Sequence, residues 1–184
     1  MSAPAVSAPL ARVPNALTIL RLALIPVFVL LLATAEGGRS WPAAIVFGVA
    51  GVTDQVDGWL ARRWHVESAF GKVADPLADR LMIDAAVLLL VVQHHRLPWA
   101  ALALILARDA LLISGYRVLV PHGYELSVNF LGKAATWLLY AALAFVMVTH
   151  EGATWPLWIF WIGVGLALAA GALYIRAALR SVTW

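Results

Sequence analysis

Long apolar runs separated by short polar breaks limit the fold of this chain more than any other feature of its sequence. The runs span about 17–35, 41–60, 75–93, 97–118, 130–149 and 155–177. Each is close to the ~20 residues that an α-helix needs to cross a bilayer. With 63% hydrophobic and 12% charged residues and a mean hydropathy of +0.87, the chain does not have the composition of a soluble domain. We therefore predict an all-α integral membrane protein with six transmembrane helices.

The basic residues are distributed unevenly, and this sets the expected orientation. If the N-terminus lies in the cytoplasm, only Arg39 and Arg96 of the thirteen lysines and arginines fall on the outer side. Such an asymmetry follows the positive-inside rule, so both termini are expected in the cytoplasm. Trp41, Trp99 and Trp155 would then mark the outer-face starts of three helices, as interfacial tryptophans commonly do.

The start of the chain, 1–14, is rich in proline, alanine and serine and is expected to be a flexible cytoplasmic segment. A single six-helix transmembrane domain is predicted to follow at 15–180. The triplet 33–35 mimics a signal-peptidase site. Cleavage there would leave five spans and break the charge asymmetry, so we do not expect it.

Four of the ten acidic residues lie within 26 positions around the connection between the second and third runs. Asp54 and Asp57 are three apart and Asp75 and Asp79 are four apart, so each pair lies near one helix face. Carboxylates at membrane depth are costly unless a cation compensates them. Because the chain has no cysteine, these oxygen donors suit Mg²⁺ or Mn²⁺. Two such ions could clamp a diphosphate.

Small residues lie between the two aspartate pairs. Gly58, Ala61 and Gly71 remove side-chain bulk where two helix ends approach or admit a flat ligand, and Arg62 is placed to reach a phosphate oxygen. Taken singly, Gly58 or Ala61 is better explained by helix packing. The complete pattern, D-x2-D-G-x2-A-R-x8-G-x3-D-x3-D, instead indicates a ligand site.

This pattern resembles the signature of the CDP-alcohol phosphatidyltransferase family without a departure, and the six runs resemble the family over nearly the whole chain. The resemblance implies that Asp54, Asp57 and Asp75 bind two divalent metals, which hold the diphosphate of CDP-diacylglycerol. It implies that Asp79 is a metal ligand and the catalytic base that deprotonates the acceptor hydroxyl, with CMP as the leaving group. A nearby metal lowers the pKa of such a base, so the metal itself is an alternative means of acidifying the hydroxyl. The implied CDP-binding residues are Asp54, Gly58, Ala61, Arg62 and Gly71.

The resemblance also implies a location and an assembly. The active site would lie on the cytoplasmic side of a multi-pass protein of the cell (inner) membrane, among membrane lipids, and a homodimer is favoured. The sixth run offers small residues that suit packing within a monomer or across a dimer, and we expect no nucleic-acid partner. These small residues are Gly163, Gly165, Ala169 and Gly171.

The acceptor is indicated by residues outside the motif. The opening PNALTILRLALIP is similar to that of the phosphatidylglycerophosphate synthase and cardiolipin synthase branch of the family. In that branch, basic residues corresponding to Arg108, Arg117 and Lys133 imply a pocket for the phosphate of glycerol 3-phosphate. An arginine midway along an apolar helix is costly without such a role, although Lys133 could instead extend to the interface.

Two departures from the synthase pattern keep a second acceptor open. Asp109 stands where glutamate is usual, and Ala135 stands where a second lysine is usual. The loss of a cation weakens the case for a phosphomonoester. Phosphatidylglycerol, the acceptor of cardiolipin synthases, is therefore the alternative to glycerol 3-phosphate.

Asp84 serves as a control for the helix-face argument. It lies five residues beyond Asp79, about 140° further round a helix, so we expect it to face away from the cluster and to find a basic partner on a neighbouring helix. A cation transporter is a distant alternative, because intramembrane carboxylates also mark ion pathways. The almost wholly apolar outer halves of the runs argue against it.

Overall fold

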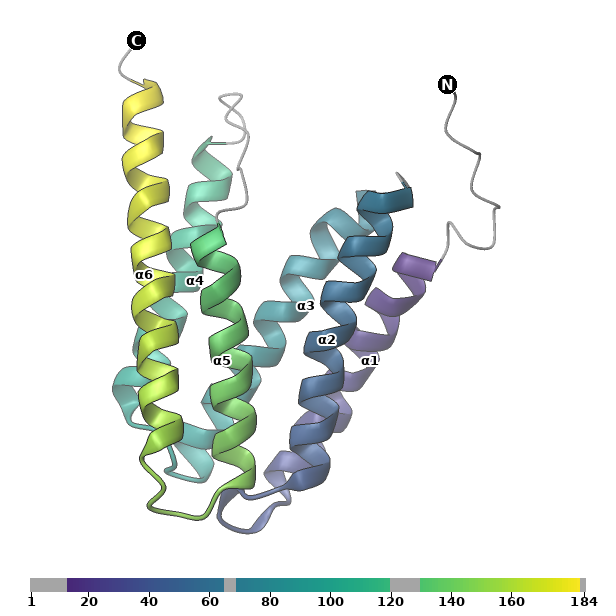
Figure 1. Ribbon diagram of the computed structural model, residues 1–184, viewed down its shortest axis with the longest axis vertical. Helices are drawn as coiled ribbons and strands as arrows, with labels where there is room; N and C mark the ends of the chain where they lie inside the picture. The colour runs from purple at the N-terminus through teal and green to yellow at the C-terminus, as the bar shows by residue number, and fades with distance from the viewer. Residues whose placement is uncertain (1–12, 65–68, 120–129, 183–184) are drawn as a thin grey trace.

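The protein is a bundle of α-helices. The computed structural model describes residues 13–64, 69–119 and 130–182, and these ranges contain no strand. The predicted all-α fold is confirmed, and each predicted apolar run coincides with one helix. The helices are α1 (Val13–Ala33), α2 (Trp41–Trp64), α3 (Ala69–Leu88), α4 (Trp99–Leu119), α5 (Phe130–Val148) and α6 (Trp155–Val182), with a 3-10 turn, η2 (Glu36–Gly38), and a π-helical turn, η3 (Leu89–Gln93) (Figure 1).

Two helices extend well beyond the predicted runs. Helix α3 begins at Ala69 rather than near 75, and α6 continues to Val182 rather than ending near 177. Hydropathy marks the part of a helix that suits lipid, whereas backbone hydrogen bonds set where the helix ends. The early start of α3 places Gly71 and Asp75 on a helix.

Within the described ranges, three helical segments are long and apolar enough to cross a bilayer by length and composition. The second half of α2 and the helices α3 and α4 carry charged residues, which lower their hydropathy. The protein is thus a membrane protein with several apolar helices, while the count of six spans stays a prediction. The three segments are Ala16–Ala33, Phe130–Val148 and Trp155–Leu173, and α2 adds the shorter apolar stretch Trp41–Thr53.

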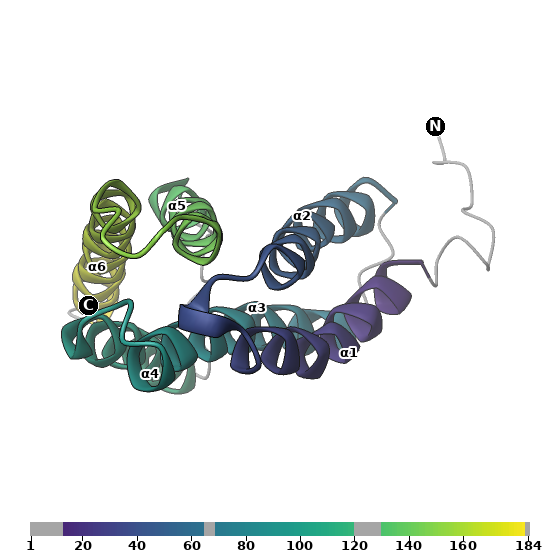
Figure 2. The same ribbon diagram turned by 90° about the horizontal axis from the view of Figure 1, so that it is seen from below.

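The helices form two layers, seen from below in Figure 2. One layer contains α6, α5 and α2, and the other contains α4, α3 and α1. Helix α5 packs on both α6 and α2, while α1 contacts α2 in one layer and α3 in the other. The buried aromatic rings of Phe28 on α1 and Phe47 on α2 join the layers, with centroids 5.2 Å apart.

Short connections at one end of the bundle, the lower end in Figure 1, are tied together by one arginine. We call this part, residues 34–40, 94–98 and 149–154, the loop end. The Arg96 guanidinium donates to the carbonyl oxygens of Gly37 (3.1 Å), Val146 (3.0 Å), Thr149 (3.1 Å) and His150 (3.3 Å). Burial lowers the pKa of Arg96, although nearby Glu151 counteracts this effect. A guanidinium keeps its proton at any ordinary pH, so these hydrogen bonds do not depend on pH.

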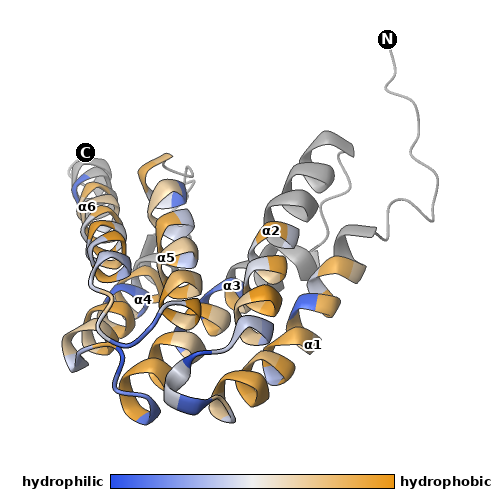
Figure 3. Ribbon diagram, turned by 60° about the horizontal axis from the view of Figure 1, so that its bottom comes forward, coloured by the Kyte–Doolittle hydropathy of each residue, from blue (hydrophilic) through white to orange (hydrophobic). Residues whose placement is uncertain are grey.

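Further hydrogen bonds reinforce the loop end. Gln93 donates to the carbonyl of Ala33 at 2.6 Å, and Arg39 donates to that of Val148 at 3.2 Å. Gly38 has a φ of 68°, and a Cβ there would lie 2.8 Å from the Cβ of His94, so only glycine fits this turn. Hydrophilic colouring concentrates on these connections in Figure 3.

The predicted tryptophan positions are confirmed as helix starts. Trp41, Trp99 and Trp155 are the first residues of α2, α4 and α6, and all three are exposed. Before α2, the Ser40 hydroxyl accepts a hydrogen bond from the backbone N–H of Ala43 at 3.1 Å, which caps the helix. The loop end therefore has the aromatic boundary expected of a membrane interface.

Candidate active site

The predicted motif is divided between two helices. Asp54 and Asp57 lie in the second half of α2 and Asp75 lies in α3. The side chains of these three aspartates, and those of Gly58, Ala61, Arg62 and Gly71, lie outside the part of the structure that is described. Their predicted roles in metal and CDP binding therefore stay predictions. Asp79, the fourth aspartate, is described in full.

Asp79 lies near the middle of α3 among positive charges and one phenol. The guanidinium groups of Arg108 on α4, Arg21 on α1 and Arg80 on α3 all act electrostatically on its carboxyl group, and Tyr140 on α5 lies within hydrogen-bonding reach. The Oδ1 atom of Asp79 is buried and has no hydrogen-bond partner among the residues that the structure describes. A buried carboxylate oxygen without a partner is costly, which indicates that a ligand completes its contacts.

Arg21 is a member of this site that the sequence analysis did not assign to it. Its side chain is 0% exposed, and Thr18, one turn earlier on α1, is also buried. The sequence analysis counted Arg21 only toward the charge asymmetry. The sequence did offer a signal that could have assigned Arg21 to the site: it is an arginine inside an apolar run, and a charge at such a depth needs an anionic neighbour.

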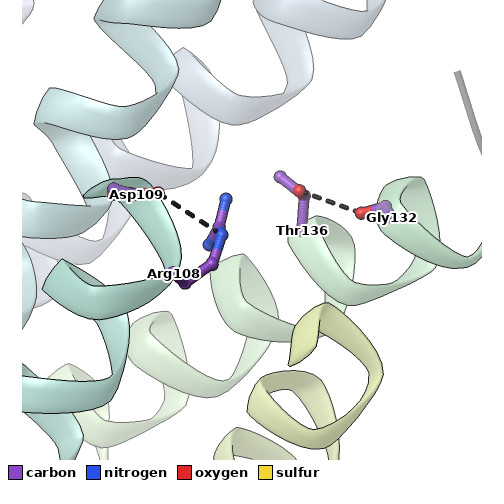
Figure 4. A network of polar contacts seen from close by, with 4 residues as sticks. All are labelled: Arg108, Asp109, Gly132 and Thr136. Atoms are coloured by element: carbon purple, nitrogen blue, oxygen red, sulfur yellow. Dashed lines mark hydrogen bonds and ion pairs between the residues drawn. The ribbon is translucent and has the colours of Figure 1, made fainter. Parts of the chain in front are cut away.

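Arg108 forms an ion pair with its neighbour in the chain (Figure 4). Its Nε atom lies 3.4 Å from Oδ1 of Asp109, and the two side chains are only 10% and 8% exposed. Arg108 also acts electrostatically on Asp79 and Asp84. The cation predicted to bind the acceptor therefore lies near the predicted catalytic base, with part of its charge already balanced by Asp109.

Asp84 has a basic neighbour on another helix, as predicted: Arg108 on α4 acts on its carboxyl group. Arg80 on its own helix also acts on it, which was not predicted. A second unpredicted neighbour is Asp109, which lies within hydrogen-bonding reach of Asp84. This acidic pair joins α3 to α4. The contact depends on how the two helices pack, which periodicity within one helix does not reveal.

The other predicted acceptor residues have different outcomes. Lys133, in the first turn of α5, is exposed, and the side chain of Arg117 lies outside the described part. Ala135 is 1% exposed, so this position faces the protein interior. On the same helix, the Thr136 hydroxyl donates to the carbonyl of Gly132 at 3.1 Å, as drawn in Figure 4.

The described residues of the site suit a divalent cation. No three acidic or histidine side chains gather among the described residues, which leave out the side chains of three of the four motif aspartates. The free Oδ1 of Asp79 is the kind of hard oxygen donor that Mg²⁺ and Mn²⁺ prefer. Asp79 is therefore suited to join the other motif aspartates as a ligand.

The small residues of α6 pack mainly within the chain. A Cβ at Gly163 would lie 3.2 Å from the side chain of Leu139 on α5, and one at Gly171 would lie 3.3 Å from Leu111 on α4. A Cβ at Gly165 would meet no described residue within 4 Å. The predicted small face thus serves packing inside the monomer at two positions.

Comparison with known proteins identifies the kind of chain that carries this site. The family model described as CDP-alcohol phosphatidyltransferase matches residues 11–169. A cardiolipin synthase (CMP-forming) from Streptomyces coelicolor is 38% identical, over 92% of this chain and 84% of the relative. A CDP-diacylglycerol–glycerol-3-phosphate 3-phosphatidyltransferase from Escherichia coli K12 is 32% identical, over 92% of both chains, and one from Shigella flexneri serotype 5b matches to the same extent.

Proposed function

This chain belongs to the CDP-alcohol phosphatidyltransferase family, and we propose that it transfers the phosphatidyl group of CDP-diacylglycerol to glycerol 3-phosphate, with release of CMP. The observation that carries the proposal is the environment of Asp79. Its partly buried carboxyl group lies near the positive charges of Arg21 and Arg108, and its Oδ1 atom is buried without a hydrogen-bond partner among the described residues. Such a site suits an anionic substrate and a proton transfer.

In the proposed reaction, a hydroxyl oxygen of the acceptor attacks the phosphorus atom that carries the diacylglycerol. The bond from this phosphorus to the bridging oxygen of the diphosphate breaks, and CMP leaves with the electron pair. Asp79 accepts the proton of the attacking hydroxyl. A positioned base of this kind contributes about 10²- to 10⁴-fold to a rate.

The arginines of the site bind and orient anionic groups. Arg108 on α4 and Arg21 on α1 both act electrostatically on Asp79. In the proposed reaction Arg108 would contact the acceptor phosphate and Arg21 would balance negative charge. Two divalent cations held by Asp54, Asp57, Asp75 and Asp79 would neutralise the diphosphate of the donor. The proposed location is the cytoplasmic face of the cell membrane, in a homodimer.

Phosphatidylglycerol is the second candidate acceptor, which would make the chain a cardiolipin synthase. One observation favours it: Ala135 supplies a buried methyl group where the synthase pattern has a second lysine. This removes a positive charge that a phosphomonoester would need. The relative from Streptomyces coelicolor bears that activity in its name.

The test is a competition assay with purified protein in detergent. CDP-diacylglycerol is offered together with glycerol 3-phosphate, phosphatidylglycerol and inositol phosphate, with and without Mn²⁺, and the lipid products are resolved by mass. The proposal expects CMP release that needs Mn²⁺, with phosphatidylglycerophosphate as the main product. Cardiolipin as the main product would select the second acceptor, and no CMP release with any acceptor would reject both.

A further inference from the structure

Tyr140 is a buried residue that belongs to no part of the aspartate motif. It lies near the middle of α5, and its side chain is 7% exposed. Its phenol is within hydrogen-bonding reach of the Asp79 carboxyl group on α3. Burial of a hydroxyl group is costly unless it finds a partner, so a phenylalanine would fill this space at lower cost if packing were the only requirement.

The ring of Tyr140 is held in place from the other side by α2. Its centroid lies 4.7 Å from that of Phe47. A Cβ at Gly51 would lie 2.8 Å from Cδ1 of the ring, closer than any side chain could be accommodated without movement. Gly51 therefore allows α5 to approach α2 at this height, one helical turn before Asp54.

These contacts connect the two helical halves of the motif through a residue outside it. The ring rests on the turn of α2 that precedes Asp54, and the hydroxyl lies within hydrogen-bonding reach of the Asp79 carboxyl group on α3. Among the described residues, the Oδ1 atom of Asp79 has no hydrogen-bond partner. A donor that approaches one side of a carboxylate limits its rotamers and so orients the other oxygen.

We propose that Tyr140 is a positioning residue that holds the Asp79 carboxyl group and aims its free oxygen at the ligand. The inference rests on the proposed function, because Asp79 is there a metal ligand and the proton acceptor. Outer partners of metal ligands typically affect metal affinity or activity by about 10- to 100-fold when they are removed. Tyr140 is expected to act within this range.

The experiment compares Tyr140→Phe with the wild-type protein in detergent, with Mn²⁺ binding measured by electron paramagnetic resonance and turnover measured by CMP release. Tyr140→Phe keeps the ring and its packing and removes only the hydroxyl. We expect the Kd for Mn²⁺ to rise by about tenfold or more and kcat to fall by a similar factor. The KM for CDP-diacylglycerol and the Tm should change no more than in the control, Trp137→Phe, which alters an exposed ring on the same helix.

Two further variants separate positioning from packing. Phe47→Leu weakens the packing against Tyr140 but keeps the hydroxyl, so it should lower the Tm more than Tyr140→Phe does while changing Mn²⁺ affinity less. Gly51→Ala should displace the ring and weaken Mn²⁺ binding although the hydroxyl is present. If Gly51→Ala does not fold, the comparison of Tyr140→Phe with Phe47→Leu decides by itself.

Wild-type affinity for Mn²⁺ and wild-type kcat in Tyr140→Phe would overturn the inference, as would a wild-type protein that binds no Mn²⁺. Weaker Mn²⁺ binding in Tyr140→Phe, together with no CMP release by the wild-type protein, would support the inference and reject the proposed function. An active wild-type protein together with an unaffected Tyr140→Phe variant would support the proposed function and reject the inference about Tyr140.

Discussion

The loop end and the polar site in the middle of the bundle differ in how completely their buried polar groups are hydrogen-bonded. At the loop end, Arg96 donates to four carbonyl oxygens, three from two connections and one, that of Val146, from the last turn of α5. In the middle of the bundle, the Oδ1 atom of Asp79 has no hydrogen-bond partner among the described residues, and Asp109 only forms a 3.4 Å ion pair with Arg108. Polar groups are therefore fully hydrogen-bonded at the loop end, where they support only the fold, and incompletely hydrogen-bonded at the site.

This difference explains why the two regions should respond differently to mutation. A satisfied hydrogen-bond network stabilises the fold, and its loss is seen in the free energy of unfolding. A carboxylate without a full set of partners lowers the free energy of unfolding of the ligand-free protein, and ligand binding raises it again. Changes at the loop end should therefore affect stability, and changes at the site should affect turnover and binding.

The largest effect is expected for Asp79→Asn. The amide cannot accept the proton of the acceptor hydroxyl, so kcat should fall by about 10²- to 10⁴-fold. The Tm should stay the same or rise, because the variant removes a buried charge. CMP release and binding of CDP-diacylglycerol, measured together, check this. Full turnover would remove Asp79 from the mechanism.

A smaller effect is expected for Arg108→Ala. Loss of a charged hydrogen bond to the acceptor should raise the acceptor KM by about 10- to 100-fold and change the KM for CDP-diacylglycerol little. Arg39→Ala is the matched control, because Arg39 is an exposed arginine of the loop end, outside the site. Equal changes in both KM values would show that Arg108 instead supports the fold, through Asp109 and Asp84.

Arg96→Ala should affect stability and leave turnover unchanged. It leaves partly buried carbonyl oxygens of the 146–150 segment without a donor, so the free energy of unfolding should fall by about 1–3 kcal/mol. Thermal unfolding in detergent measures this, with Arg39→Ala, which removes one exposed hydrogen bond, as the milder control. A large loss of kcat in folded Arg96→Ala would contradict the separation of the two regions.

The smallest effect is expected for Asp84→Asn. An asparagine amide can donate to Asp109 and so can replace a carboxyl group in the acidic pair. Turnover and both KM values should change by less than about threefold, an effect below 1 kcal/mol. An inactive variant would mean that Asp84 belongs to the reacting part of the site and that its predicted helix face is wrong.

The positions of the helices could be predicted because they depend on local sequence. The runs that became α1, α2, α4 and α5 were placed within a few residues, and the tryptophans at 41, 99 and 155 mark helix starts. The early start of α3 was missed because its first turns are polar, and the prediction relied on apolar runs. The arrangement of Arg21 and Tyr140 around Asp79 was missed because these residues lie on separate helices.

The sequence by itself determined the all-α membrane class and the family, and it predicted Asp79 as a site residue, because apolar run length and motif spacing act within one or two neighbouring segments. The tertiary structure alone decided that Arg21, Arg108 and Tyr140 gather at Asp79, and that Asp84 meets Asp109. These contacts arise from the packing of α1, α3, α4 and α5, and helix packing depends on side-chain shape across helices rather than on the order of residues within one of them.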